Sequence, residues 1–138
     1  MLRTIAAQQP DLVIHLGDYV RDAEKLRTAL PQQALVNVRG NCDPGANAEE
    51  RAEFEVCGVQ VFACHGHRYG VKTSLDALLN AGYFSGAGLV LFGHTHIARH
   101  LCISGMEVVN PGSAQHSCAV IDIEPETGKI EVRLQAVN

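Results

Sequence analysis

The sequence predicts an α/β fold in which mixed β-sheets form a sandwich flanked by helices. Short runs of β-branched and apolar residues recur along the chain, and Gly or Pro bounds them, which is typical of buried strands. Segments with helical spacing separate several of these runs. The C-terminal segment alternates polar and apolar residues on both sides of a turn, which indicates an antiparallel hairpin. No linker, repeat or low-complexity segment interrupts the sequence, so residues 1–138 are expected to form one domain.

Five predicted strands each end next to glycine and a residue type that binds metals. The runs and the motifs that follow them are 11–16 with Gly17-Asp18, 34–39 with Gly40-Asn41-Cys42-Asp43, 59–64 with His65-Gly66-His67, 89–92 with Gly93-His94-Thr95-His96, and 106–109 with Asn110-Pro111-Gly112-Ser113. In open α/β sheets, ligands bind beyond the carboxyl ends of the strands. Four successive strands deliver Asp, Asn or His there, so the sequence predicts a metal site at this edge.

Helical spacing and turn residues predict the remaining elements. Helices are expected at 2–8, at 23–30, and from Thr73 or Ser74 to Gly82, and the hairpin strands at 117–124 and 129–137. Pro31 is expected to end the second helix, because proline lacks the backbone donor that a helix needs. Gly82 is expected to end the third helix.

Composition excludes several classes of protein. The net charge is −4, and the 11 Lys and Arg residues are scattered, so no extended nucleic-acid-binding surface is expected. No apolar run approaches the roughly 18 residues of a membrane span, so no membrane association is expected. The N-terminus lacks the features of a signal peptide, which predicts a cytoplasmic protein. The five cysteines include no C-x-x-C pair and are expected to be reduced.

The predicted ligands suit a borderline divalent ion. Asp18, Asn41, His65 and His94 offer one carboxylate, one amide oxygen and two imidazoles. This mixed set favours Mn²⁺, Fe²⁺, Zn²⁺ or Ni²⁺ over Ca²⁺ or Mg²⁺. His96 lies two residues after His94, so both would point to the same side of an extended segment. The Asp18 carboxylate could bridge two ions about 3.5–4 Å apart and leave His96 for the second ion.

The five motifs, in this order, resemble those of the calcineurin-like metallophosphoesterase superfamily. The Gly-Asn-Cys-Asp sequence at 40–43 is typical of its small bacterial phosphodiesterase branch. The resemblance extends over about residues 1–133 and implies a β-sandwich in α-β-β-α layers. It also implies that Asp18 bridges the ions, that Asn41, His65 and His94 complete the shell of one ion, and that His96 belongs to the other.

The resemblance also implies catalytic roles for Asp18, Asn41 and His67. His67, Asp43 and Arg68 are candidates either for holding the metal ligands in place or for contact with phosphate. Cys42 stands where many members of the superfamily have a histidine that acts as general acid. A thiol with a pKa near 8.5 is a poor replacement for that histidine, so a catalytic role for Cys42 is not expected.

The family implies a divalent-metal-dependent phosphoesterase, and within that class a phosphodiesterase. A hydroxide activated by the metal would attack phosphorus, a small phosphodiester would be the substrate, and Mn²⁺ is the expected ion ahead of Ni²⁺, Fe²⁺ and Zn²⁺. The family begins with a strand ending in Asp-x-His, which this sequence does not match. Only Asp18 and His96 then remain for the first ion, so we expect one firmly bound ion and weak or no activity.

The unmatched first strand leaves further expectations. We expect a shortened or misassigned start, with a naturally short protein as the alternative. A gap in the sheet would favour a homo-oligomer. One rival function is a non-enzymatic protein-interaction scaffold, the use that a retromer subunit of the superfamily makes of this fold; another is a gene fragment without function. A scaffold would keep its partner after His65 and His94 are replaced by alanine.

Overall fold

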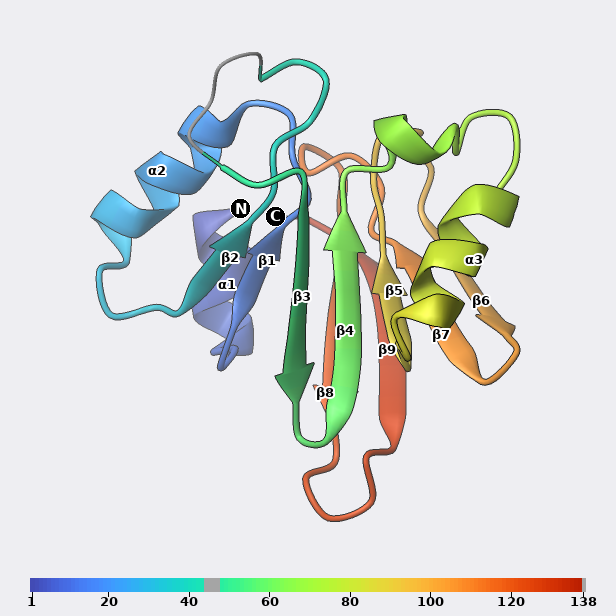
Figure 1. Ribbon diagram of the computed structural model, residues 1–138. Helices are drawn as coiled ribbons and strands as arrows, with labels where there is room; N and C mark the ends of the chain where they lie inside the picture. Colours follow the sequence, from blue (N-terminus) through green and yellow to red (C-terminus); the bar gives the residue numbers. More distant parts are fainter. Residues whose placement is uncertain (44–47, 138) are drawn as a thin grey trace.

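The structure is a computed structural model that describes residues 1–43 and 48–137 (Figure 1). Its helices are α1 (Leu2–Gln8), α2 (Val20–Ala29) and α3 (Asp76–Phe84), with a 3₁₀ turn η1 (His67–Tyr69). Its strands are β1 (Val13–His15), β2 (Leu35–Asn37), β3 (Arg51–Val56), β4 (Val59–Cys64), β5 (Leu89–Leu91), β6 (Arg99–Ile103), β7 (Met106–Asn110), β8 (Ser117–Ile123) and β9 (Ile130–Ala136). All five apolar runs form strands, and the C-terminal hairpin forms as predicted.

The largest sheet has five strands in the order β3-β4-β5-β7-β6. Strands β4, β5 and β7 run parallel in its centre, and β3 and β6 pair antiparallel at its edges. A central parallel strand is covered on both faces and therefore consists of apolar residues, as in Leu89–Leu91, which are all buried.

Two cores lie on the two faces of this sheet. Successive residues of a strand point to opposite faces. Phe62 of β4 accordingly joins the core with α3, which also contains Leu78. Its neighbours Val61 and Ala63 join the core that faces the second layer of the sandwich.

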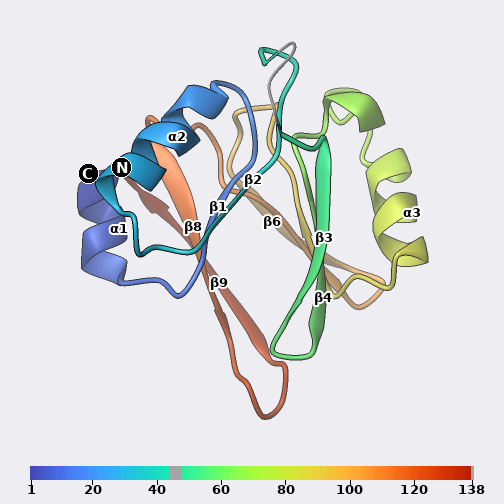
Figure 2. The same cartoon turned by 60° about the vertical axis from the view of Figure 1, so that its left-hand side comes forward.

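The second layer contains β1, β2 and the C-terminal hairpin. Strand β1 pairs in parallel with β2, and β8 pairs antiparallel with β9. Ile14 of β1, Ile121 of β8 and Val132 of β9 all pack on the same face of the five-stranded sheet. Helices α1 and α2 lie outside this layer, and α3 lies on the far side of the other (Figures 1 and 2). The predicted mixed sandwich in α-β-β-α layers is confirmed.

The sequence analysis did not predict the two edge strands β3 and β6. Each lies next to its partner in the chain and is joined to it by a turn of two residues with positive φ. The turn residues are Cys57 (φ 50°) and Gly58 (φ 80°) for β3-β4, and Ser104 (φ 51°) and Gly105 (φ 77°) for β6-β7. Strand β3 alternates charged and uncharged residues, and β6 begins with Arg99 and His100, so neither forms an apolar run long enough to predict a buried strand.

Helix α3 continues past its predicted end. It ends at Phe84, and Gly82 lies inside it in a buried position. A Cβ atom on Gly82 would meet Val90 Cγ2 of β5 at 2.7 Å. This glycine therefore permits close packing of the helix on the sheet and does not end the helix. None of the described helices has both the length and the apolar character needed to cross a membrane.

Candidate metal centre

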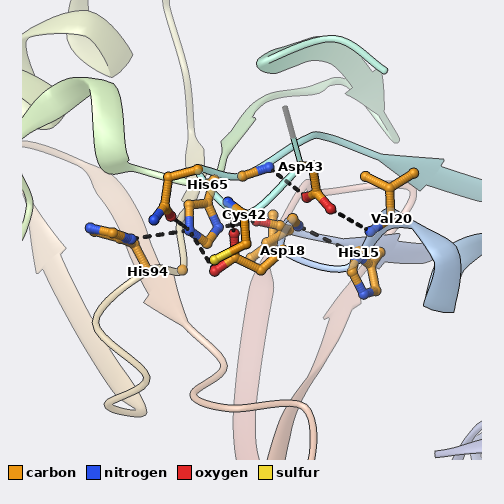
Figure 3. A network of polar contacts seen from close by, with 12 residues as sticks. His15, Asp18, Val20, Cys42, Asp43, His65 and His94 are labelled. Carbon is orange, nitrogen blue, oxygen red and sulfur yellow. Dashed lines mark hydrogen bonds and ion pairs between the residues drawn. The ribbon is translucent and has the colours of Figure 1, made fainter. Parts of the chain in front are cut away.

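Four of the predicted ligands lie together beyond the carboxyl ends of four strands. Asp18 follows β1, Asn41 follows β2, His65 follows β4 and His94 follows β5. Strand β1 pairs in parallel with β2, and β4 pairs in parallel with β5. The carboxyl ends of each pair therefore lie at the same edge. Figure 3 shows His65 between His94 and Asp18.

The cluster is organised around one nitrogen of His65. Its Nε2 atom lies 3.0 Å from Asn41 Oδ1, 3.1 Å from His94 Nδ1 and 3.4 Å from Asp18 Oδ2. Only 2 % of His65 is exposed, so these contacts form away from bulk water. The sequence predicted that these four residues share one ion, and the structure brings all four together.

The other nitrogen of His65 determines the charge balance of the cluster. Its Nδ1 atom lies 2.8 Å from the carbonyl oxygen of Leu16, which only accepts, so Nδ1 carries a proton. In the neutral ring, Nε2 then has a lone pair that faces the oxygens of Asn41 and Asp18. Acceptors facing one another repel unless a cation lies between them. A ligating histidine commonly donates its second N–H to a carbonyl in this way.

The spacing of the donor atoms also fits a metal ion. Donors bound to one ion at about 2.0–2.2 Å lie about 3.0–3.5 Å from one another, which matches the separations around His65 Nε2. In the described part of the chain, no three or more His, Cys, Asp or Glu side chains are placed to hold a metal ion without a further donor. The amide oxygen of Asn41 is the further donor, and it makes the set one of mixed oxygen and nitrogen ligands.

Asp18 is held in place by the backbone around it. Its φ of 55° is in the left-handed region, which is costly for a residue other than glycine and is found at functional sites. The backbone N–H of Cys42 donates a 2.9 Å hydrogen bond to Asp18 Oδ1, which leaves Oδ2 facing His65. A Cβ atom on Gly40 would lie 2.6 Å from the Asp18 nitrogen and would collide with Oδ1. Gly40 is therefore required for this close approach.

Asp43 has a different position from the one expected for a phosphate contact. Its Oδ1 accepts a 2.8 Å hydrogen bond from the N–H of Val20, and its Oδ2 accepts one of 3.0 Å from Gly40. Asp43 is buried and links the start of α2 to the loop after β2 (Figure 3). This cap explains why α2 begins at Val20, three residues before the predicted start at residue 23.

His96 follows His94 by two residues, on the same loop after β5. Residues His94 (φ 67°) and His96 (φ 60°) both have positive φ, so their segment is bent rather than extended. The expected projection of both side chains to one side therefore does not apply. His96 is exposed, and among the described residues its side chain has no hydrogen bond, ion pair or ring contact with the cluster.

Asn110 fixes the bent segment that carries His94. Its side chain is fully buried, and its Nδ2 donates to the carbonyl of Gly93 at 3.1 Å and to Thr95 Oγ1 at 2.9 Å. Its Oδ1 accepts a 2.9 Å hydrogen bond from the N–H of Gly112. The asparagine at the end of β7 is thus a positioning residue for His94.

His67 lies between the cluster and an open cleft. Its ring centroid is 5.4 Å from that of His65 and 6.2 Å from that of His94. Its buried Nδ1 atom has no hydrogen-bond partner within the described residues. The cleft has a volume of about 480 Å³, and its lining includes His67, Arg68 and the buried Cys64, the pKa of which burial raises to about 12.

Electrostatics keep the two other site histidines neutral near pH 7. Burial, and then the proximity of His65 and Lys72, lower the pKa of His94 below 6.5. Burial, and then His65 and Arg68, lower the pKa of His67. Neutral imidazoles have lone pairs that can bind a metal. Desolvation, and then the charge of Asp18, raise the pKa of the Cys42 thiol, which makes it a still weaker acid.

Sequence reasoning missed the rest of the cleft. Its lining also includes Arg39, Glu50, Arg51 and Tyr69, which come from the loop after β2, from β3 and from η1. Arg39 lies two residues before Asn41, and Tyr69 lies two residues after His67, so proximity to a motif was the available signal for these two. Glu50 and Arg51 lie at the start of the unpredicted edge strand β3.

Comparison with known proteins agrees with this architecture. The sequence profile of the "Calcineurin-like phosphoesterase superfamily domain" matches residues 1–125. A protein named "Probable metallophosphoesterase YsnB" from Bacillus subtilis (strain 168) is 31% identical over 150 residues, which cover 99% of this chain and 85% of that protein.

Two solved structures share the fold at low sequence identity. Vps29 from Entamoeba histolytica, solved in complex with Zn²⁺, matches with a TM-score of 0.74 at 18% identity over 99% of this chain and 88% of its own. A protein described as a novel archaeal phosphodiesterase matches with a TM-score of 0.68 at 18% identity over 96% of this chain and 88% of its own. The profile match covers most of the sequence, and the chain belongs to the calcineurin-like phosphoesterase superfamily.

Proposed function

We propose that this protein is a divalent-metal-dependent phosphoesterase that hydrolyses small phosphodiesters in the cytoplasm. Mn²⁺ is the proposed ion, and Ni²⁺, Fe²⁺ and Zn²⁺ suit the same donors. The observation that carries the proposal is the convergence of Asp18, Asn41 and His94 on His65 Nε2 at 3.0–3.4 Å. Family membership and a curated relative named as a metallophosphoesterase support the same reaction class.

Four side chains of the cluster would bind the ion, and two backbone groups orient them. Asp18, Asn41, His65 and His94 would hold the ion, which when bound lowers the pKa of water and neutralises charge on a phosphoryl group. The backbone of Cys42 orients Asp18, and the carbonyl of Leu16 orients His65. Both contacts are made by backbone groups, so they fix the two side chains independently of other side chains.

His67 is the proposed phosphate contact. It lies next to His65 and His94, and its lowered pKa keeps the ring neutral near pH 7. It would therefore orient a phosphate oxygen by hydrogen bonding and not by charge. The exposed Cys42 has a raised pKa and is not assigned a proton-transfer role.

We expect one firmly bound ion per chain, because four of the five predicted ligands form one cluster, and among the described residues His96 has no hydrogen bond, ion pair or ring contact with it. Mn²⁺ stoichiometry and affinity can be measured by calorimetry after treatment with EDTA. The variant His65→Gln should weaken binding at least about 100-fold, since it removes the central donor. His100→Gln, which changes an exposed histidine paired with Glu107, is the matched control and should bind as wild type does.

Hydrolysis of bis-p-nitrophenyl phosphate with Mn²⁺ tests the activity. Asp18→Asn should reduce kcat at least about 100-fold, because it removes the carboxylate charge from the site. Asp122→Asn, an exposed aspartate on β8, is the control. Turnover that survives both EDTA and Asp18→Asn would refute the proposal. If Mn²⁺ binds firmly without turnover, recovery of turnover on addition of a strand ending in Asp-x-His would support the enzyme, and no recovery would favour the scaffold alternative.

A further inference from the structure

We propose that the arginine-lined cleft beside the metal centre binds a second anionic group of the substrate. This inference rests on the proposed function and names its substrate class: phosphodiesters in which one ester arm carries a further phosphate. The phosphodiester phosphorus would lie at the cluster around His65, and the arm with the additional phosphate would extend past His67 into the cleft.

The charge of the cleft differs from that of the whole protein. Three arginines and two glutamates line it, so its charged residues are net positive on a chain with a net charge of −4. The charged lining residues are Arg39, Arg51, Arg68, Glu49 and Glu50. Arginine binds phosphate through a planar fork of donors and is more weakly hydrated than lysine, which suits it to such a site.

Two of these arginines already bind an anion in the structure. Arg39 Nη2 donates to Glu50 Oε1 at 2.9 Å, and Arg68 donates to the same oxygen through Nη2 at 3.0 Å and Nε at 3.3 Å. All three contacts use one oxygen of one carboxylate. The arrangement is a two-arginine anion site in which the side chain of Glu50 takes the place of a ligand.

The third arginine, Arg51, makes only long polar contacts with its N–H donors among the described residues. Arg51 Nη1 makes a long 3.4 Å contact with the Tyr69 hydroxyl, and its Nη2 lies 3.7 Å from Glu53 Oε2. Its guanidinium also lies over the Phe62 ring, with Cζ 5.8 Å from the centroid. These weak contacts hold the side chain at the cleft without satisfying its five N–H donors.

The cleft and the metal centre share a wall. Gly66 and His67 line the cleft, and they directly follow His65 in the chain. The ring of His67 lies 5.4 Å from that of His65. A cleft of about 480 Å³ has room for a phosphorylated arm of a small ester. A ligand that spans both places would pass His67, which has an unpartnered ring nitrogen.

A substitution of Glu50 distinguishes anion binding by Arg39 and Arg68 from a purely structural role of their ion pairs with Glu50. If the arginines only brace the loop after β2, Glu50→Gln would weaken the fold and leave anion binding unchanged. If the cleft binds anions, Glu50 competes with them, and Glu50→Gln should tighten binding. Arg39→Gln and Arg68→Gln should have the opposite effect.

The first experiment measures binding of inorganic pyrophosphate to the full chain in EDTA, by calorimetry or by NMR titration. Wild type and Asp18→Asn should bind alike, because the cleft does not need the metal ligands. Each of Arg39→Gln and Arg68→Gln should weaken binding about tenfold, and Glu50→Gln should strengthen it about threefold or more. Arg133→Gln, on β9 and outside the cleft, is the matched control. Thermal melting of each variant identifies any that is unfolded.

The second experiment compares two chromogenic diesters with Mn²⁺. Thymidine 5′-(p-nitrophenyl phosphate) and its 3′-phosphorylated form differ only in a second phosphate. Wild type should show a KM about tenfold lower for the phosphorylated form. Arg39→Gln and Arg68→Gln should both lose this advantage, and Arg39→Gln should keep turnover of the unphosphorylated diester.

The outcomes separate this inference from the proposed function. Equal KM values for the two diesters would overturn the inference and leave phosphodiester hydrolysis in place. The same holds if the affinity for pyrophosphate is unchanged in Arg39→Gln, Arg68→Gln and Glu50→Gln. Absence of turnover with both diesters would count against the proposed function, and the pyrophosphate titration would still decide whether the cleft binds anions. Unchanged pyrophosphate affinity in the well-folded variant Glu50→Gln would overturn the competition argument.

Discussion

At the scale of single residues, His65 and His15 differ in which ring nitrogen carries the proton. His65 uses Nδ1 to donate to the Leu16 carbonyl, whereas His15 uses Nδ1 to accept a 3.3 Å hydrogen bond from the N–H of Gly17. The two rings therefore hold their protons on different nitrogens, and only His65 turns a lone pair toward the cluster. Residue type alone predicts a ligand, but the partner of the second nitrogen determines whether it can act as one.

His15 predicts a pH dependence of stability. Burial lowers the pKa of His15 below 6.5, so between that lowered value and about 6.5 the unfolded chain binds a proton that the folded chain does not. The free energy of unfolding should therefore fall as the pH drops below about 6.5, by at most about 1.4 kcal/mol per pH unit for this group. Urea unfolding in EDTA from pH 7.5 to 5.0 measures it.

The variant His15→Gln should flatten part of that slope, while His67 and His94, the pKa values of which are also lowered, keep the rest. His116→Gln, which removes an exposed histidine, is the control for the loss of an imidazole ring. Identical slopes in wild type and His15→Gln would contradict the assignment.

At the scale of elements, the loops after the strands position the ligands. Strands β1 and β2 end side by side, and the loops that follow carry Asp18 and Asn41. Two backbone features set their geometry: the left-handed conformation of Asp18 and the close approach of Gly40. The C-terminal end of β7 contributes Asn110, which acts on His94 through the loop after β5.

Gly40→Ala should damage the metal site more than the fold. The added methyl group would lie 2.6 Å from the Asp18 nitrogen and force this ligand to move. Mn²⁺ affinity should fall by about 10–100-fold. Gly58→Ala is the control: its φ is 80°, nothing lies within 4 Å of the added atom, and it should cost about 1 kcal/mol of stability without changing Mn²⁺ affinity. Equal Mn²⁺ affinities in the two variants would be evidence against the packing argument.

Asn110→Ala should destabilise the protein and loosen His94. It removes three hydrogen bonds and leaves the N–H of Gly112 and the carbonyl of Gly93 without their side-chain partner. Chemical denaturation should show a loss of about 2–3 kcal/mol. Asn80→Ala, an exposed site on α3, should stay within about 0.5 kcal/mol of wild type. A similar small change in Asn110→Ala would show that the described contacts are not important for stability.

At the scale of the whole molecule, the core between the two layers holds the site together. Strand β1, the pair β8 and β9, and the pair β4 and β5 belong to three different sheets, and their apolar side chains meet in one core. The ligands Asp18 and His65 come from opposite layers, so their approach depends on this core rather than on either sheet alone.

Leu91→Ala tests this dependence. Leu91 of β5 is 4% exposed and belongs to the core between the layers, so its truncation should cost about 2–4 kcal/mol. Leu134→Ala on β9, where the side chain is 39% exposed, should cost less than about 1 kcal/mol. Thermal and urea unfolding measure both. A cost for Leu91→Ala no greater than that for Leu134→Ala would mean that the two layers are not held together by this core.

Much of this architecture could be predicted from the order of residues. The five apolar runs became strands, and the residues that follow four of them met at one edge, because apolar runs and the direction of parallel strands are local properties. The edge strands β3 and β6 escaped prediction because their pairing, and not their apolar content, makes them strands. The end of α3 was misplaced because a glycine can serve close packing as well as helix termination.

The sequence by itself determined the superfamily, the strand ends and the residue types Asp18, Asn41, His65 and His94, since each of these follows from short stretches of chain. Only the tertiary structure decided that the segment with His94 and His96 is bent, that Asp43 caps α2, and that Arg39, Arg68 and Glu50 meet in one cleft. The physical reason is that backbone conformation in the loops, and contacts between residues far apart in the chain, depend on how the two layers pack.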